Sequence, residues 1–203
     1  NIYGLSFAID VRIKFKGILD HIDKKFWPKD LNKYVAWNND AVLKMFDNLM
    51  VDGLNSPFFL FIHLNGRFEP QISYKVEKIK SILKSKGYYD DSIIIMNSDH
   101  SMPDPSENRS YFYYKWLMDN GIPLNRHDLI MTDDNILIPL VMKYPNCPKK
   151  NIDVQVGSID IFHTVLDLLD IKYSNSLTEI YGGESLVPLI KGERMEEYLS
   201  RKF

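Results

Sequence analysis

Apolar residues along the chain follow two spacings that predict different kinds of strand. Val11, Ile13 and Phe15 alternate with basic residues, which is typical of a half-exposed strand. Residues 58–62 and 93–96 are instead continuous apolar runs. Such runs are typical of strands that are buried on both faces of a parallel sheet. We therefore expect two buried strands in these segments.

Four further segments repeat apolar residues at helical spacing. They cover residues 31–50, 72–83, 111–118 and 159–169. Gly87 is expected to end the second helix in a left-handed C-cap, and Ser158 is expected to N-cap the fourth. Asp160 lies in the first turn of the fourth helix, where a carboxylate interacts favourably with the helix dipole. Capping is therefore the role expected for Asp160.

The order of strand, helix and strand over residues 58–96 predicts a βαβ unit, whose crossover is almost always right-handed. Both strands should then end at the same edge of a sheet. Residues 136–144 form another apolar segment, which contains Pro139. Because proline cannot donate a hydrogen bond to a neighbouring strand, this strand should be peripheral or begin after Pro139. The predicted fold class is α/β, with a mixed, largely parallel sheet flanked by helices.

Polar residues follow the second apolar run at once, in the order Ser98, Asp99 and His100. Ligands of open α/β sheets gather outside the carboxyl ends of the strands, so Asp99 and His100 are candidate metal ligands. The alternative is a loop cap beside a surface imidazole. His63, at the end of the first run, is a candidate site residue, although it could simply hydrogen-bond a neighbouring backbone group. His21 and His163 are expected to be structural.

Composition narrows the function classes. The chain has 203 residues, of which 45% are hydrophobic, and its net charge of −2 comes from 25 basic and 27 acidic residues. This balance gives no sign of a surface for nucleic acid. No apolar stretch reaches the roughly 20 residues that span a bilayer. Cys147 is the only cysteine, so an internal disulfide is excluded, while the compartment stays open.

Several of these segments together resemble sulfatases. Residues 57–63, 87–100, 138–141, 158–169 and 183–186 occur in the order and approximate spacing of that family. The resemblance extends from about Asp40 to Gly192. The chain is similar to the C-terminal part of a sulfatase domain in the alkaline-phosphatase-like superfamily.

The resemblance implies a divalent metal at the carboxyl edge of the sheet. Calcium is expected, with magnesium, zinc or manganese as alternatives. Asp99 and His100 match the metal-ligand pair of the family, and His63 and His127 match regions that supply catalytic or substrate-binding histidines. Where the family often has a second histidine, this chain carries Arg67, whose guanidinium suits an oxyanion. An exposed loop arginine is the alternative interpretation of Arg67.

The nucleophile motif of the family, Cys/Ser-x-Pro-x-Arg, does not occur in the chain. Cys147 is followed directly by Pro148, which is the wrong spacing, and is expected to be a loop thiol. Residues 1–203 are therefore expected to be the C-terminal portion of one incomplete domain, and inactive alone. The family also usually has glycine after the Asp-His pair, where this chain has Ser101.

Three function classes remain open at this point. The leading one is metal-dependent hydrolysis of a sulfate ester, in which this chain supplies part of the metal and substrate site. The second is phosphoryl chemistry by a phosphodiesterase or a phosphoglycerol or phosphoethanolamine transferase of the same superfamily. The third is a binding module without turnover. A cysteine in the absent motif would favour the first class, because sulfatases of this family use formylglycine.

Overall fold

The computed structural model describes residues 3–6, 24–25, 39–51, 53, 57–62, 64, 70–101, 108–122, 133–172 and 182–201. The chain divides into two compact units, Asn1–Tyr144 and Pro145–Phe203.

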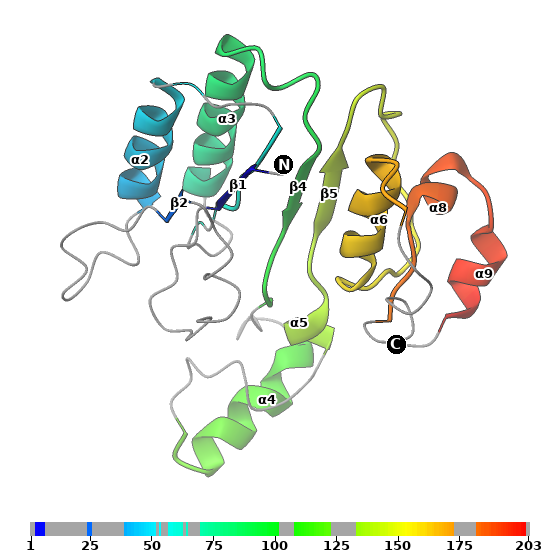
Figure 1. Cartoon of the computed structure of the whole chain (residues 1–203). Coiled ribbons are helices and arrows are strands. Elements are labelled where there is room, and N and C mark those ends of the chain that lie inside the picture. The colour runs from blue at the N-terminus through cyan, green and yellow to red at the C-terminus, as the bar shows by residue number, and fades with distance from the viewer. Residues whose placement is uncertain are drawn as a thin grey trace. The chain divides into compact units, whose positions relative to one another are not determined.

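The first unit contains two small sheets among its described residues. Strands β1 (Tyr3–Ser6), β2 (Lys24–Lys25) and β3 (Phe58–Phe59) pair in parallel in the order β2-β1-β3. Strands β4 (Ile94–Asn97) and β5 (Leu140–Lys143) form an antiparallel pair (Figure 1). The fold is therefore a mixed α/β arrangement, while a largely parallel sheet stays a prediction.

The two apolar runs that predicted strands do contain β3 and β4, but the described ladders connect them to other partners. β3 pairs with β1, and β4 pairs with β5 so that Asn97 lies opposite Leu140. β5 begins at Leu140, directly after Pro139, as predicted. The strand expected at 11–16 lies outside the described residues.

Four helices of the first unit are described. They are α2 (Asn39–Val51), α3 (Pro70–Ser85), α4 (Asn108–Asp119) and α5 (Asp133–Ile136). The helices predicted over 72–83 and 111–118 are confirmed. Gly87 has the predicted left-handed conformation, with φ of +74°. The N–H of Tyr88 donates to the carbonyl of Leu83 at 2.9 Å, which closes this end of α3.

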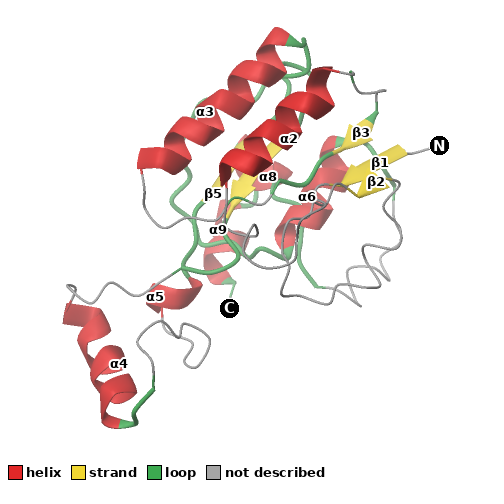
Figure 2. Ribbon diagram, turned by 90° about the vertical axis from the view of Figure 1, so that its left-hand side faces the viewer, coloured by secondary structure: helices red, strands yellow, loops and turns green. Residues whose placement is uncertain are grey.

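Helices α2 and α3 lie side by side (Figures 1 and 2) and supply the buried side chains of the larger of the two hydrophobic clusters that the described residues of this unit form. These buried side chains are Val42, Phe46, Leu49, Met50 and Leu83. Partly buried residues from two other segments pack against the same cluster, among them Ile62 and Leu64 on one side and Ile94 on the other. The segment that carries His63 and the strand that leads to Asp99 therefore share one core.

Lys143, the last residue of β5, fastens this strand to the turn before β4. Its ammonium group donates hydrogen bonds to the carbonyls of Tyr89, Asp90 (2.5 Å) and Ser92 (3.1 Å). The same nitrogen lies 4.8 Å from the centre of the Tyr89 ring, within range of a cation–π interaction. β4 is thus anchored at the end opposite to Asp99.

The second unit contains α6 (Asp160–Leu168), α8 (Val187–Lys191) and α9 (Met195–Ser200). The predicted helix over 159–169 is confirmed, but the prediction that Ser158 caps it is wrong. Ile159 occupies the N-cap position, and no side chain caps the helix there. Asp160 instead accepts a hydrogen bond from the backbone N–H of Gly157 at 2.8 Å, as a carboxylate in the first turn can do when it reaches back.

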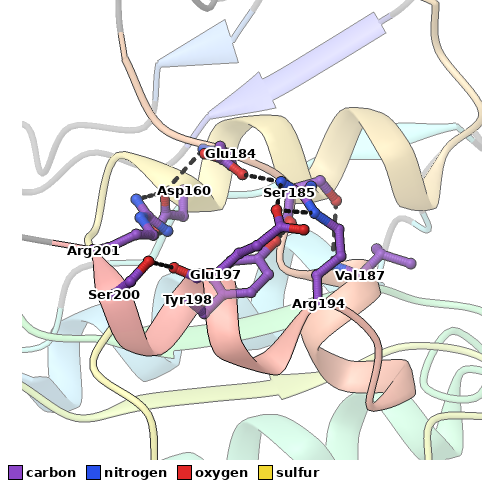
Figure 3. Close-up of polar contacts among 9 residues, drawn as sticks. All are labelled: Asp160, Glu184, Ser185, Val187, Arg194, Glu197, Tyr198, Ser200 and Arg201. Atoms are coloured by element: carbon purple, nitrogen blue, oxygen red, sulfur yellow. Dashed lines mark hydrogen bonds and ion pairs between the residues drawn. The ribbon is translucent and has the colours of Figure 1, made fainter.

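Asp160 has a second role that its position in the helix does not reveal. Its carboxylate is fully buried and accepts two hydrogen bonds from Arg201, at 2.8 and 3.0 Å (Figure 3). It also accepts the N–H of Glu184 at 2.9 Å. The hydrogen bond to Asp160 raises the pKa of Arg201 above its ordinary value. This one carboxylate therefore connects α6 both to the segment before α8 and to the end of α9.

Further contacts hold the 182–186 segment against α6. His163, which is buried, donates from Nε2 to the carbonyl of Gly182 at 2.7 Å, so its predicted structural role is confirmed. The hydroxyl of Thr164 accepts the N–H of Leu186 at 2.8 Å. Gly183 has φ of +83°, and a Cβ at this position would lie 2.5 Å from the carbonyl oxygen of Ile159. Only glycine therefore fits this approach without a shift of the backbone.

The buried ion pair predicts an unequal effect of two arginine substitutions. Arg201→Ala should cost about 3 kcal/mol, because it leaves the Asp160 carboxylate buried without its charge partner. Arg194→Ala is the matched control, since Arg194 also lies over the Tyr198 ring but pairs with exposed Glu197. It should destabilise the second unit much less, because exposed ion pairs contribute little to stability. Hydrogen exchange of the α6 amides in the whole chain measures both effects, and equal values would contradict the assignment.

Two glycine substitutions separate close approach from backbone strain. Gly192→Ala places an alanine at φ of +85° with no heavy atom within 4 Å of its Cβ. It should therefore cost only about 1–2 kcal/mol of left-handed strain. Gly183→Ala should cost clearly more, because its Cβ also overlaps the backbone of Ile159. Urea unfolding of both variants tests this order, and a Gly183→Ala protein as stable as Gly192→Ala would refute it.

Candidate active site

The candidate site lies where β4 ends. The apolar run predicted the strand correctly, but the expectation that both faces are buried is wrong for the described structure. Ile94 and Ile95 are half-buried, and Met96 is 39% exposed. An apolar run predicts a strand. Whether both faces of that strand are buried depends on the segments that pack against them, and these segments are distant in the sequence.

Asp99 follows β4 in a short turn and points its carboxylate toward solvent. Its side chain is 66% exposed. Oδ1 accepts the N–H of the next residue, His100, at 3.0 Å. This bond orients the carboxylate without burying it. Oδ2 is the oxygen that faces the His100 ring.

The His100 ring is oriented by a backbone carbonyl. Its Nδ1 donates to the carbonyl of Ser101 at 2.8 Å. In a neutral ring the lone pair then lies on Nε2, the nitrogen that is 3.7 Å from Asp99 Oδ2. Metal-binding histidines commonly hold the second ring nitrogen in this way, with a hydrogen bond to a carbonyl or carboxylate.

The distance between these two atoms suits a shared metal ion. With metal–nitrogen and metal–oxygen distances of about 2.0–2.6 Å, two donors in adjacent coordination positions lie roughly 3–4 Å apart. One carboxylate oxygen and one imidazole nitrogen nevertheless make only part of a coordination shell. Within the described ranges, no group of three or more His, Cys, Asp or Glu side chains could hold a metal. Asp99 and His100 therefore fit a divalent metal as two ligands of a larger set.

Two serines, Ser98 and Ser101, shape this turn. Ser98 donates its hydroxyl to the carbonyl of His100 at 2.6 Å. The N–H of Ser101 donates to the backbone carbonyl of Asn135, in α5, at 2.8 Å. Ser101 takes the place of the expected glycine without a positive φ, because the described non-glycine residues with positive φ are Asn146, Asp170 and Arg194. The signal for Ser98 was its place directly before Asp99.

The structure does not describe the three other predicted site residues. His63, Arg67 and His127 lie outside the described residues, so their roles stay predictions. Cys147 lies in the loop after β5, half-buried, as expected of a loop thiol. In the part of the chain that the structure describes, no helix is long and apolar enough to cross a membrane.

Comparison with known proteins adds two findings. A family model described as Sulfatase matches residues 71–171, which include α3, β4 and the Asp99–His100 turn. The crystal structure of Ps i-CgsB in complex with k-i-k-neocarrahexaose resembles this chain with 18% identity and a TM-score of 0.54, and the likeness covers 77% of this chain. A second crystal structure of Ps i-CgsB gives 17% identity and a TM-score of 0.55.

These structural likenesses concern the fold. The chain spans 39% of the length of Ps i-CgsB in both comparisons. No curated protein matches the chain.

The hydrogen bond of the His100 ring predicts its tautomer. The carbonyl of Ser101 can only accept, so the neutral ring should carry its proton on Nδ1 and its lone pair on Nε2. Nitrogen-15 NMR of the imidazole at alkaline pH distinguishes the two tautomers. A His100→Gln variant assigns the signal. A ring protonated on Nε2 would contradict this geometry.

Proposed function

We propose that the whole protein hydrolyses a sulfate ester and uses a divalent metal to do so, because residues 71–171 of this chain match the Sulfatase family model. In this proposal the chain supplies part of the metal and substrate site. The observation that carries it is the Asp99–His100 pair, which follows β4 within the matched segment and keeps its two donor atoms 3.7 Å apart.

Asp99 and His100 are proposed to hold the metal, with calcium as the preferred ion and magnesium, zinc or manganese as alternatives. When bound, a divalent metal stabilises negative charge that develops on oxygens of the ester group. The exposure of Asp99 supports this assignment, because a carboxylate already enclosed by protein donors would have little capacity for a metal. Asp160 is the opposite case, because its carboxylate is fully buried and paired with Arg201.

His63 and His127 are proposed to act on the substrate, and Arg67 to bind the sulfate group. A protonated imidazole or a guanidinium can neutralise charge on the ester oxygens. One contact supports the assignment of His63. Its neighbours Ile62 and Leu64 pack against the same core cluster as the first residue of β4. Ile62, Leu64 and the strand that leads to Asp99 therefore pack against the same hydrophobic cluster.

The nucleophile is proposed to come from outside these residues. No Cys/Ser-x-Pro-x-Arg segment occurs in the chain, and the chain spans 39% of the length of Ps i-CgsB. We therefore assign residues 1–203 to the C-terminal portion of one sulfatase domain, whose N-terminal portion bears the nucleophile. A chain without that nucleophile should bind substrate and metal incompletely and have no turnover.

Hydrolysis of a chromogenic aryl sulfate by the full-length protein tests this function. Asp99→Asn should lower the rate by more than about 100-fold, because it removes a charged metal ligand while keeping the size of the side chain. Asp91→Asn makes the same change at an exposed position before β4 and should leave the rate within about twofold.

The 203-residue chain alone should show no turnover in the same assay. Metal-dependent turnover by this chain that disappears in Asp99→Asn would show that it holds a complete site. Hydrolysis of a chromogenic phosphodiester but of no sulfate by the full-length protein would favour phosphoryl chemistry. Absence of both activities would favour a binding module.

A further inference from the structure

A hydrogen bond from the Ser98 hydroxyl to the backbone carbonyl of His100 closes the turn after β4. Ser98 Oγ lies 2.6 Å from the carbonyl oxygen of His100 and 3.4 Å from Oδ1 of Asp99. A hydroxyl has one proton to donate, and hydrogen bonds between oxygens are normally about 2.5–3.0 Å long. The proton therefore goes to the carbonyl of His100, and the Asp99 carboxylate stays available to accept the N–H of His100.

This bond fixes the backbone on both sides of the two candidate ligands. The carbonyl of His100 is held back toward Ser98, which defines the direction in which the peptide continues into Ser101. Ser101 in turn accepts the His100 ring proton through its carbonyl and donates its N–H to Asn135. The orientation of the ring thus depends on a continuous set of hydrogen bonds that begins at the Ser98 hydroxyl.

We propose that Ser98 is a positioning residue for the metal pair, and that its hydroxyl holds Asp99 Oδ2 and His100 Nε2 at the separation that one metal ion requires. The inference rests on the proposed metal role of this pair. Ser98 itself need not contact the metal. Its effect is on the fraction of molecules whose turn already has the binding geometry, and the apparent dissociation constant rises as that fraction falls.

Ser92 offers a matched control at the other end of β4. Its hydroxyl also donates to a backbone carbonyl, that of Tyr88, at 2.5 Å. Ser92→Ala therefore removes the same group and the same kind of bond from the segment just before β4, away from Asp99 and His100. Ser98→Thr is the conservative variant, because threonine keeps the hydroxyl that Ser98→Ala removes.

The experiment titrates Mn²⁺ into the full 203-residue chain and follows the paramagnetic broadening of the His100 ring signals by NMR. Ser98→Ala should require at least about tenfold more Mn²⁺ for the same broadening, which is the size of loss usual for groups that support metal ligands. Ser98→Thr and Ser92→Ala should stay within about twofold of the unsubstituted chain. Circular dichroism of each variant verifies that it is folded.

Three results would overturn the inference and leave the proposed function intact. One is an unchanged Mn²⁺ requirement in folded Ser98→Ala, and another is an equal loss in Ser98→Ala and Ser98→Thr. An equal loss in Ser92→Ala would also overturn it, because the effect would then belong to β4 as a whole. If Mn²⁺ leaves the His100 signals of the unsubstituted chain unbroadened at every concentration, the pair does not bind metal in this chain, and the inference about Ser98 is overturned.

Discussion

The antiparallel ladder between β4 and β5 is the constraint on which the candidate site depends. Its register places Asn97 opposite Leu140, so the residues after β4 run beside those that precede β5. This is why the N–H of Ser101 reaches the carbonyl of Asn135 in α5. At the other end of the ladder Lys143 binds three carbonyls of the preceding turn. The strand that presents Asp99 is therefore fixed at both ends.

A different kind of constraint organises the second unit. A carboxylate loses most of its hydration when it is buried, and the cost is large unless charge and hydrogen bonds replace the water. Asp160 receives that replacement from Arg201 and from the N–H groups of Gly157 and Glu184. Because these donors come from three places along the chain, burial of one side chain requires all three to be in position. Figure 3 shows the contacts with Arg201 and Glu184.

Asp99 and Asp160 show how environment separates two uses of the same side chain. The Asp160 carboxylate is buried and engaged with a guanidinium, which suits it to hold structure together. The Asp99 carboxylate is mostly exposed and bonded only lightly within its own turn, which leaves it capacity to bind a cation. Near Asp99, the neighbouring His100 ring adds a nitrogen donor at 3.7 Å.

The sequence by itself determined the elements whose signals are local. Helical spacing predicted α3, α4 and α6, Gly87 marked the end of α3, and Pro139 set the start of β5, because each signal acts within a few residues of the chain. The position of Asp99 and His100 directly after a strand could be predicted for the same reason. The roles of His63, Arg67 and His127 stay predictions from family resemblance, since these residues lie outside the described part of the chain.

Only the tertiary structure decided which segments meet. It gave β4 an antiparallel partner 43 to 49 positions away, left Met96 partly exposed, and put Ile159 rather than Ser158 at the N-cap of α6. It also joined Asp160 to Arg201, 41 residues further along the chain. Hydrophobic periodicity indicates which face of a helix or strand is buried, but it does not indicate which other segment packs against that face. Pairing, register and the partners of a buried charge therefore come from the packed chain.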